Sequence, residues 1–352
     1  MSVELKTKKP SESYFEKVLP FASDEGLRDQ YVNYMGDIRF GKILEEMDMA
    51  AGIISYRHAD GFEQNLGIVT AACDRIDLLG PLRVDRDLRI MGQVNHVGRS
   101  SMEVGLRLDS RIDDQWTLVS RAYFIMVARN LTGAAPVNML SPQTEEEKRR
   151  DEEGKKRAIS RKDQARSGLL NQPPTGDESS LIHDMYLKLR AGELDGVPMA
   201  KTLNTSLKIM QPQERNIHNK IFGGHIMRLS FESGFMTAHL FCKKRPWFLN
   251  VDHFDFYQPV EIGSFVRFTS QVIFTGKTSF VVQVKVWVVD PTTGAEVVTN
   301  VSYFTFAAIN DQKKPIPVPR ILPNTYEEQL KYLNGRRRYL NGKALRSSRE
   351  TS

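Results

Sequence analysis

Apolar residues recur along this chain with two different periods. Residues 43–54 and 226–235 repeat apolar side chains every three or four positions, the period of a helix with one buried face. Residues 102–108 alternate apolar and other side chains, and residues 280–288 are rich in valine, both typical of β-strands. We therefore predict two long amphipathic helices of roughly four turns, each followed by four or five strands.

The two predicted helices belong to a sequence repeat. Residues 32–52 resemble residues 215–234, and the strand-rich regions that follow match at a nearly constant offset: Asp77 with Asp255, Pro81 with Pro259, and residues 122–128 with 302–308. Hairpin-length turns, such as residues 290–294, join the consecutive strands. This order predicts an α+β fold in which an antiparallel sheet wraps one long helix in each copy.

The limits of the two copies predict the domain organisation. We expect an N-terminal extension at residues 1–20, a first domain at 21–140, a charged helical and flexible linker at 141–199, a second domain at 200–320 and a basic C-terminal tail at 321–352. The linker carries a run of mixed charges at residues 145–166 and a turn-rich stretch at 172–180. We expect the charged run and the basic tail to be solvated, although the tail could touch phosphates or anionic lipid.

Composition limits the class of protein. With 352 residues, 40% of them hydrophobic and 26% charged, the chain is long enough for two cores. The net charge of +6 is weak evidence for partners that carry phosphates, and no nucleic acid is expected. No apolar run approaches the roughly 18 residues of a membrane span, and the first residues lack a secretory signal, which predicts a soluble intracellular protein. Cys73 and Cys242 lack metal-binding spacing and are expected to be buried free thiols.

Several catalytic classes carry motifs that this sequence lacks. There is no GxSxG elbow, no phosphate-binding GxxxxGK[ST] loop and no HExxH helix. The closest approach to metal-ligand spacing is His218 with His225. A serine hydrolase, a P-loop nucleotidase or a zinc hydrolase is therefore disfavoured, and neither a metal nor a cofactor is expected.

The first copy places chemistry-bearing residues around the start of its helix. Asn33 precedes a glycine-bearing turn, and Asp48 follows Gly41 by seven residues. Such a turn exposes N–H groups that can stabilise an anionic ligand or oxyanion. Apolar neighbours such as Met47 and Met49 would partly desolvate the carboxylate and make it a better base, and the amide can hold a carbonyl or a water. This set suits hydrolysis of an activated acyl group, although an Asn before Gly and an acid among apolar neighbours are also common in ordinary turns and helices.

The second copy repeats this layout with two changes. Asn219 stands where the first copy has Gly36, and because Asn tolerates a left-handed backbone we expect the turn to survive. Asn216 precedes this position by three residues, as Asn33 does in the first copy. Glu232 follows Gly224 by eight residues rather than seven. The repetition in one register favours a functional site over packing alone.

A second repeated element lies between two predicted strands in each copy. It contains a glycine, a cation and two hydroxyl residues: Arg99, Ser100 and Ser101 in the first copy, and Lys277, Thr278 and Ser279 in the second. These groups could hold the phosphates or pantetheine amides of a coenzyme. An ordinary hairpin turn explains the pattern equally well.

Taken together, these segments resemble the hotdog-fold acyl-coenzyme A thioesterases, in particular the mitochondrial type with two hotdog domains in one chain. The resemblance covers residues 33–130 and 204–319 and is carried by NYMGDIRFGKILEEMD, GRSSMEV, NIHNKIFGGHIM and GKTSFVV. It implies that the two domains pack as a pseudo-dimer, that acyl-CoA is hydrolysed to fatty acid and coenzyme A, and that chains assemble as trimers. It also implies the mitochondrial matrix, with the cytoplasm as the alternative because no clear presequence is present.

The resemblance assigns roles to the site residues. It implies that Asp48, as general base or nucleophile, pairs with Asn216 of the other domain, and that Asn33 pairs with Glu232. In the second pair, Phe231 occupies the position expected for the acid, and Glu232 follows it by one residue. In this interpretation the coenzyme lies near the cations of the two repeated turns.

The resemblance also places oxyanion donors at the start of the helices, on the backbone near Gly223 and Gly224, with Gly41 in the matching turn. Two other functions stay open. One is a non-catalytic acyl-CoA sensor, and the other is an acyl-thioester hydratase, although the catalytic His segment of that class is absent.

Overall fold

The computed structural model describes residues 5–166, 172–217 and 219–350, which form two compact units. Unit 1 comprises Met1–Ile159, Met210–Leu229 and His253–Ser264. Unit 2 comprises Ser160–Ile209, Ser230–Asp252 and Phe265–Ser352. The start of the second long helix thus belongs with the first sequence copy, and the domain limits expected from the sequence stay a prediction.

Unit 1 contains an antiparallel sheet in the order β12-β3-β7-β6-β5-β2, to which β12 contributes its last residues. Two short strands, β1 and β9, pair in parallel beside it. The strands are β1 (Thr7–Lys8), β2 (Phe15–Leu19), β3 (Gly67–Cys73), β4 (Ile76–Leu78), β5 (Leu88–Val97), β6 (Ser101–Ile112), β7 (Gln115–Asn130), β8 (Gly133–Ala134), β9 (Met139–Leu140) and β12 (Arg245–Phe256).

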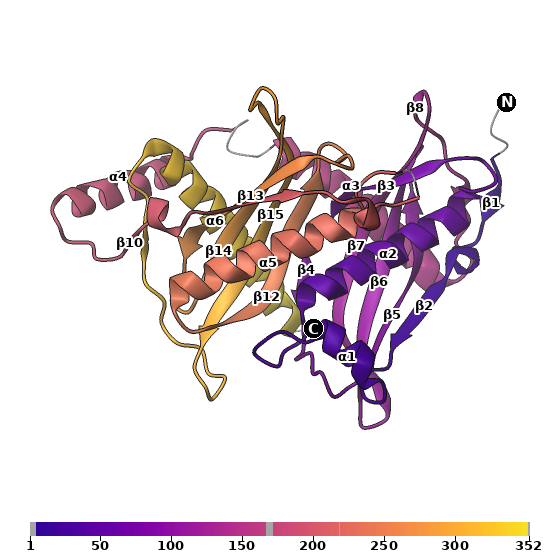
Figure 1. The fold of residues 1–352 in the computed structure, drawn as a ribbon, viewed down its shortest axis with the longest axis horizontal. Coiled ribbons are helices and arrows are strands. Elements are labelled where there is room, and N and C mark those ends of the chain that lie inside the picture. Colours follow the sequence, from indigo (N-terminus) through magenta and orange to yellow (C-terminus); the bar gives the residue numbers. More distant parts are fainter. Residues whose placement is uncertain (1–4, 167–171, 218, 351–352) are drawn as a thin grey trace. The chain divides into compact units, whose positions relative to one another are not determined.

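The helix α2 (Phe40–Ala59) packs along the sheet of unit 1, against β3, β5, β6 and β7 (Figure 1). Its apolar stripe, which includes Ile43, Leu44 and Ile54, is fully buried, as the helical period predicts. The helix ends where Asp60 adopts a left-handed backbone with φ 48°. Unit 1 also contains η1 (Pro10–Ser13), α1 (Glu25–Tyr31), η3 (Pro212–Glu214) and the first part of α3 (Glu145–Arg166).

Unit 2 repeats this plan with the strand order β11-β13-β14-β15-β12. The helix α5 (Gly223–Cys242) packs on this sheet, where Ser233 and Thr237 form hydrogen bonds with Ser270 of β13. The remaining elements are α4 (Gly176–Arg190), β10 (Val197–Pro198), η2 (Met199–Thr202), β11 (Asn204–Ile209), β13 (Phe265–Thr275), β14 (Ser279–Val289), β15 (Glu296–Ile309), β16 (Ile321–Leu322) and α6 (Tyr326–Glu350). The predicted fold class, a long helix against an antiparallel sheet in each repeat, is confirmed.

The charged helix α3 is not merely solvated, as the sequence suggested. Arg157 of α3 pairs with the buried Glu103 at 2.6 Å and stacks on the ring of Tyr123 at 3.8 Å. One turn earlier, Gly154 lies so close to the sheet that an added Cβ would be 2.6 Å from Cβ of His96. A glycine and a stacked guanidinium therefore dock this helix on the sheet despite its charged composition.

The basic C-terminal segment docks in the same way. Arg338 of α6 pairs with Asp252 and stacks on the ring of Tyr303 at 3.7 Å, while a Cβ added to Gly335 would be 2.7 Å from Cβ of Phe274. Figure 1 shows α6 alongside β13 and β14 of unit 2. The expectation of a solvated tail is therefore wrong for α6.

The expectation of a flexible linker over residues 172–180 is wrong from Gly176 onward, where helix α4 begins. Thr175 caps α4, so residues from Gly176 onward are helical. Glu178 in its first turn pairs with Arg337 of α6 at 2.6 Å. The cap and this ion pair order the segment that composition assigned to a linker.

The repeat extends into the helices that follow each sheet. Thr144 and Glu147 form a reciprocal capping pair at the start of α3, and Thr325 and Glu328 form the same pair at the start of α6. The two capping pairs, the two docking glycines and the two docking arginines are all related by one and the same shift along the sequence. We conclude that α3 and α6 are equivalent elements of the two copies.

Two further expectations concern cysteines and membranes. Both cysteines are free thiols, but only Cys73 is buried, while Cys242 is partly exposed near the end of α5. Among the described residues, no helix is both long enough and apolar enough to cross a bilayer.

Candidate active site

Asp48 lies in the middle of α2 with its side chain inside unit 1. The residue is 1% exposed, and its Oδ1 accepts a 2.6 Å hydrogen bond from the hydroxyl of Thr70 on β3. The helical period turns Asp48 toward the sheet together with the core residues of α2. The structure thus joins the predicted carboxylate to a hydroxyl that the sequence did not suggest.

The other carboxylate oxygen, Oδ2, is buried and has no hydrogen-bond partner within the described part of the chain. A Cβ added to Gly223, the first residue of α5, would lie 3.0 Å from this oxygen and 3.3 Å from the hydroxyl of Thr70. Phe256 of β12 lies 3.5 Å from the same position. Glycine therefore leaves space beside the unpaired oxygen that any larger residue would fill.

The environment makes Asp48 a stronger base than an exposed aspartate. Burial raises the pKa of Asp48 from its ordinary 3.8 to about 6, and the charge of Glu45 adds to this rise. The hydroxyl of Thr70 and the backbone N–H of Gly224 oppose burial by stabilising the carboxylate. The group is therefore mostly ionised at neutral pH while keeping a pKa suited to proton transfer.

The two asparagine turns have the same backbone. Gly36 and Asn219 both adopt the left-handed conformation, with φ of 78° and 56°, so the predicted equivalence of these turns is confirmed. Oδ1 of Asn33 accepts hydrogen bonds from two N–H groups of its own turn, and Oδ1 of Asn216 accepts one from Lys220 at 3.2 Å. Each amide oxygen therefore stabilises its own turn.

The glycines at the second position of each long helix serve packing. A Cβ on Gly41 would lie 3.1 Å from the carbonyl oxygen of Arg228, and one on Gly224 would lie 2.9 Å from Cα of Glu45. Gly41 thus faces backbone of α5, whereas Gly224 also presents its N–H to Asp48. Only the second glycine has a visible link to the carboxylate.

The predicted coenzyme residues form two hairpin turns. Carbonyl oxygens of Arg99 and Ser100 accept backbone hydrogen bonds from Val137 and Ala128, and those of Lys277 and Thr278 do the same in unit 2. Ser101 and Ser279 close the turns through their carbonyls, and the hydroxyl of Ser279 also contacts Tyr339 at 3.2 Å. The cationic side chains of Arg99 and Lys277 are exposed.

The second copy has aromatic residues where the first has its acid and hydroxyl. In the alignment of the two copies, Asp48 corresponds to Phe231 and Thr70 corresponds to Phe248. These two rings contact each other edge to face, with centroids 5.2 Å apart, in unit 2. Glu232 lies on the neighbouring position of α5 and is partly exposed. The side chains at the two equivalent positions are thus in contact in both copies, but in the second copy neither one is an acid or a hydroxyl.

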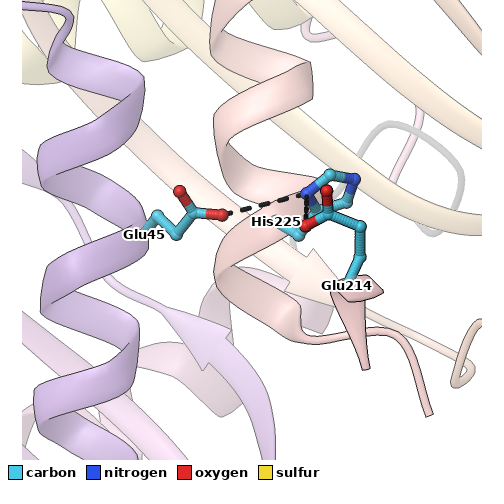
Figure 2. A group of neighbouring side chains, drawn as sticks. All are labelled: Glu45, Glu214 and His225. Carbon is cyan, nitrogen blue, oxygen red and sulfur yellow. Dashed lines mark ion pairs between the residues drawn. The ribbon is translucent and has the colours of Figure 1, made fainter. Parts of the chain in front are cut away.

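One group in the described ranges combines side chains that bind metals. Ligand atoms of Glu45, Glu214 and His225 lie within 4.8 Å of one another (Figure 2). The guanidinium of Arg228 reaches Nδ1 of His225 at 2.9 Å and lies 3.5 Å from Glu45. Because this guanidinium already supplies positive charge to the carboxylates, we assign no metal to the group.

The chain is similar to known proteins along most of its length. The model of the Thioesterase superfamily matches residues 35–115 and 218–295. Acyl-coenzyme A thioesterase 9, mitochondrial, of Mus musculus is 35% identical over 95% of this chain and 79% of its own length. Acyl-coenzyme A thioesterase 2, chloroplastic, of Humulus lupulus is 36% identical over 94% of this chain and 81% of its own.

Among solved structures, an acyl-CoA hydrolase from Staphylococcus aureus is 26% identical, with a TM-score of 0.42, over 44% of this chain and 94% of its own. The identity to the curated relatives extends over nearly the whole sequence, and the superfamily model matches both copies of the repeat. The chain therefore belongs to the acyl-coenzyme A thioesterases of the Thioesterase superfamily, in the type that carries two hotdog segments.

Proposed function

We propose that this protein hydrolyses acyl-CoA thioesters to fatty acid and coenzyme A at Asp48. The observation that carries this proposal is the buried carboxylate itself: one oxygen is held by Thr70, and the other is unpaired beside Gly223. Burial also raises the pKa of Asp48 to about 6. The family supplies the substrate class, since the curated relatives are named acyl-coenzyme A thioesterases.

In the proposed reaction, Asp48 acts as a general base. Its unpaired oxygen takes a proton from water as the water oxygen attacks the thioester carbonyl carbon. The carbonyl oxygen becomes an oxyanion beside the N–H groups at the start of α5, near Gly223 and Gly224. When the intermediate collapses, the C–S bond breaks and the proton held by Asp48 passes to the departing thiolate. A direct attack by the carboxylate would use the same geometry through an anhydride.

Thr70 and Asn216 have supporting roles in this proposal. The hydroxyl of Thr70 fixes the rotamer of the carboxylate, so the unpaired oxygen faces Gly223. The side-chain amide of Asn216 would orient the water or the carbonyl, and the hydrogen bond that its oxygen accepts from the backbone N–H of Lys220 would hold it in place.

We propose one working site per chain. The replacement of the acid and hydroxyl by Phe231 and Phe248 supports this, since neither side chain can move a proton. A site that uses Glu232 with Asn33 would need another orientation of the acid, and it stays a prediction.

The exposed cations Arg99 and Lys277 are proposed to bind coenzyme A phosphates. The neighbouring residues Ser100, Ser101, Thr278 and Ser279 stay predictions, and their backbone roles in the hairpins favour a structural function. Replacing each cation with Met should raise KM for acyl-CoA and leave kcat unchanged. An unchanged KM would remove both from the site.

A thiol-trapping assay tests the proposed function. Purified protein with acyl-CoA should release free coenzyme A over many turnovers, and Asp48→Asn should abolish release while retaining ligand binding. Asp109→Asn is the matched control, because Asp109 is a buried carboxylate paired with Arg89 rather than with Thr70. Tight binding without release by the unaltered protein would instead establish an acyl-CoA sensor.

Assembly and location complete the proposal. We propose a homotrimer, which rests on the family resemblance and is tested by the mass in sedimentation equilibrium. The relative from Mus musculus reported above is named mitochondrial, and the one from Humulus lupulus is named chloroplastic. We propose the mitochondrial matrix, to be tested by imaging the natural full-length protein.

A further inference from the structure

We propose that Glu45 and Arg228 form a clamp that positions the first turn of α5 against Asp48. This inference rests on the proposed function, because it gives the residues of the clamp a positioning role in hydrolysis at Asp48. The hydrogen-bond partners of the Asp48 carboxylate are Thr70 and the backbone of Gly224, not Glu45 or Arg228. Glu45 and Arg228 would therefore act on Asp48 through the backbone of Gly224.

The packing of α2 against the start of α5 centres on two glycines. Gly41 faces the backbone of Arg228, and Gly224 faces the backbone of Glu45. An added Cβ would lie 3.1 Å from the carbonyl oxygen of Arg228 in the first case and 3.0 Å from that of Glu45 in the second. The two glycines occupy equivalent positions of the repeat, and so do the two charged residues. The glycine of each helix therefore packs against the charged clamp residue of the other helix.

Ionic contacts lock this close approach. The guanidinium of Arg228 lies 3.5 Å from the carboxylate of Glu45 and 4.0 Å from that of Glu214, and it donates a 2.9 Å hydrogen bond to Nδ1 of His225. Lys42, one turn before Glu45 on α2, lies 3.5 Å from it. These groups are at most about a third exposed, so solvent weakens their attraction less than on an open surface.

The carboxylate of Glu45 remains charged in these surroundings. Its pKa is lowered overall, since His225, Arg228 and Lys42 outweigh the effect of burial. Figure 2 shows Glu45 reaching from α2 toward His225 on α5, with Glu214 on the segment before α5. A fixed negative charge on one helix thus meets fixed positive charge on the other.

The clamp is adjacent to the reacting groups on both helices. Glu45 precedes Asp48 by three residues on α2, so both side chains lie on one face. His225 directly follows Gly224, whose N–H faces the carboxylate of Asp48. If the clamp loosens, the first turn of α5 can move relative to α2, and this N–H moves with it. Displacements of about 1 Å at a reacting centre reduce turnover by about 100-fold.

A comparison of two neighbouring glutamates tests the proposal. Glu45→Gln removes the charge that meets α5, while the control Glu46→Gln removes an equally buried charge on the same helix that pairs with Lys17 and Tyr31 instead. We expect kcat to fall by about 10-fold in Glu45→Gln with KM unchanged, and Glu46→Gln to keep both. Arg228→Lys, which keeps the charge, should retain more of kcat than Arg228→Met.

Amide hydrogen exchange reports whether the first turn of α5 is held in place. The first turn of α5 should exchange faster in Glu45→Gln than in Glu46→Gln, at matched thermal midpoints. Equal kcat and equal exchange in the two variants would overturn the clamp. If Asp48→Asn kept its activity in the same assay, the proposed function would fail instead, so the two failures are distinguishable.

Discussion

Asp48→Asn should stabilise this protein at neutral pH while it abolishes hydrolysis. The pKa of Asp48 is raised from 3.8 to about 6, mainly because the carboxylate is buried. Two pKa units correspond to about 3 kcal/mol of unfavourable ionisation in the folded state. Asparagine is nearly isosteric with aspartate, can still bond to Thr70 and carries no charge, so it removes this penalty.

The sign of the pH dependence follows from the raised pKa. Between pH 3.8 and about 6 the folded protein binds more protons at Asp48 than the unfolded chain, so its stability falls as pH rises through this range. The stability of Asp48→Asn should not fall in this way, because asparagine does not ionise. The difference in free energy of unfolding should therefore be small near pH 4, widen through pH 6 and reach about 3 kcal/mol above pH 7.

Urea unfolding of both proteins across this pH range measures the difference. The control Asp109→Asn should be destabilising instead, since Asp109 is buried and paired with Arg89 and Arg107. In the same buffers, kcat/KM of the unaltered protein should decline below about pH 6 as Asp48 gains its proton. Stability curves of Asp48→Asn and the unaltered protein that run parallel from acid to neutral pH would refute the reasoning.

Three further changes test other parts of the structure. Gly223→Ala should abolish turnover yet leave folding intact, because its methyl group would lie 3.0 Å from the unpaired oxygen of Asp48; activity and circular dichroism report both. Arg157→Met should lower the free energy of unfolding in urea by about 3 kcal/mol, because it leaves the buried Glu103 without its guanidinium. Phe231→Ala should cost about 3 kcal/mol in the same assay by opening a cavity, and leave kcat within a few-fold.

Local patterns predicted the elements and the turns of this fold. The helical period located α2 and α5, and the tolerance of Asn for a left-handed backbone predicted the turn at Asn219. Both properties depend on residues close together in the chain, where spacing is informative. Asp48 was predicted as the candidate base in the same way, from its distance to the turn.

Tertiary packing determined what the sequence could not reveal at the site. Thr70 is on β3 and Phe256 is on β12, and no spacing rule relates either residue to Asp48. The expected desolvation by Met49 was wrong, because Met49 is 41% exposed, whereas Met47 is fully buried. Adjacent residues on a helix point in different directions, so the burial of Asp48 comes from the sheet and α5.

Composition misled for the charged helices α3 and α6, although a signal was present. Long charged side chains can bury their stems, as Arg157 and Arg338 do over tyrosine rings. The two capping pairs and the docking glycines recur with the same separation along the sequence. A repeat search extended past the last strand of each sheet would have identified both helices as structural.

The energetics of burial explain why the equivalent positions of the two copies carry different residues, Asp48 in the first and Phe231 in the second. A buried carboxylate near pKa 6 costs about 3 kcal/mol at neutral pH. At the equivalent positions of the second copy, the aromatic pair Phe231 and Phe248 gains stability from packing instead. In the first copy Asp48 and Thr70 are in contact. In the second copy the equivalent residues, Phe231 and Phe248, are also in contact but are not polar. Phe231→Asp should then cost more stability than Phe231→Ala, because it buries a charge without a hydroxyl partner, and an equal cost in urea unfolding would argue that the second position is still a polar site.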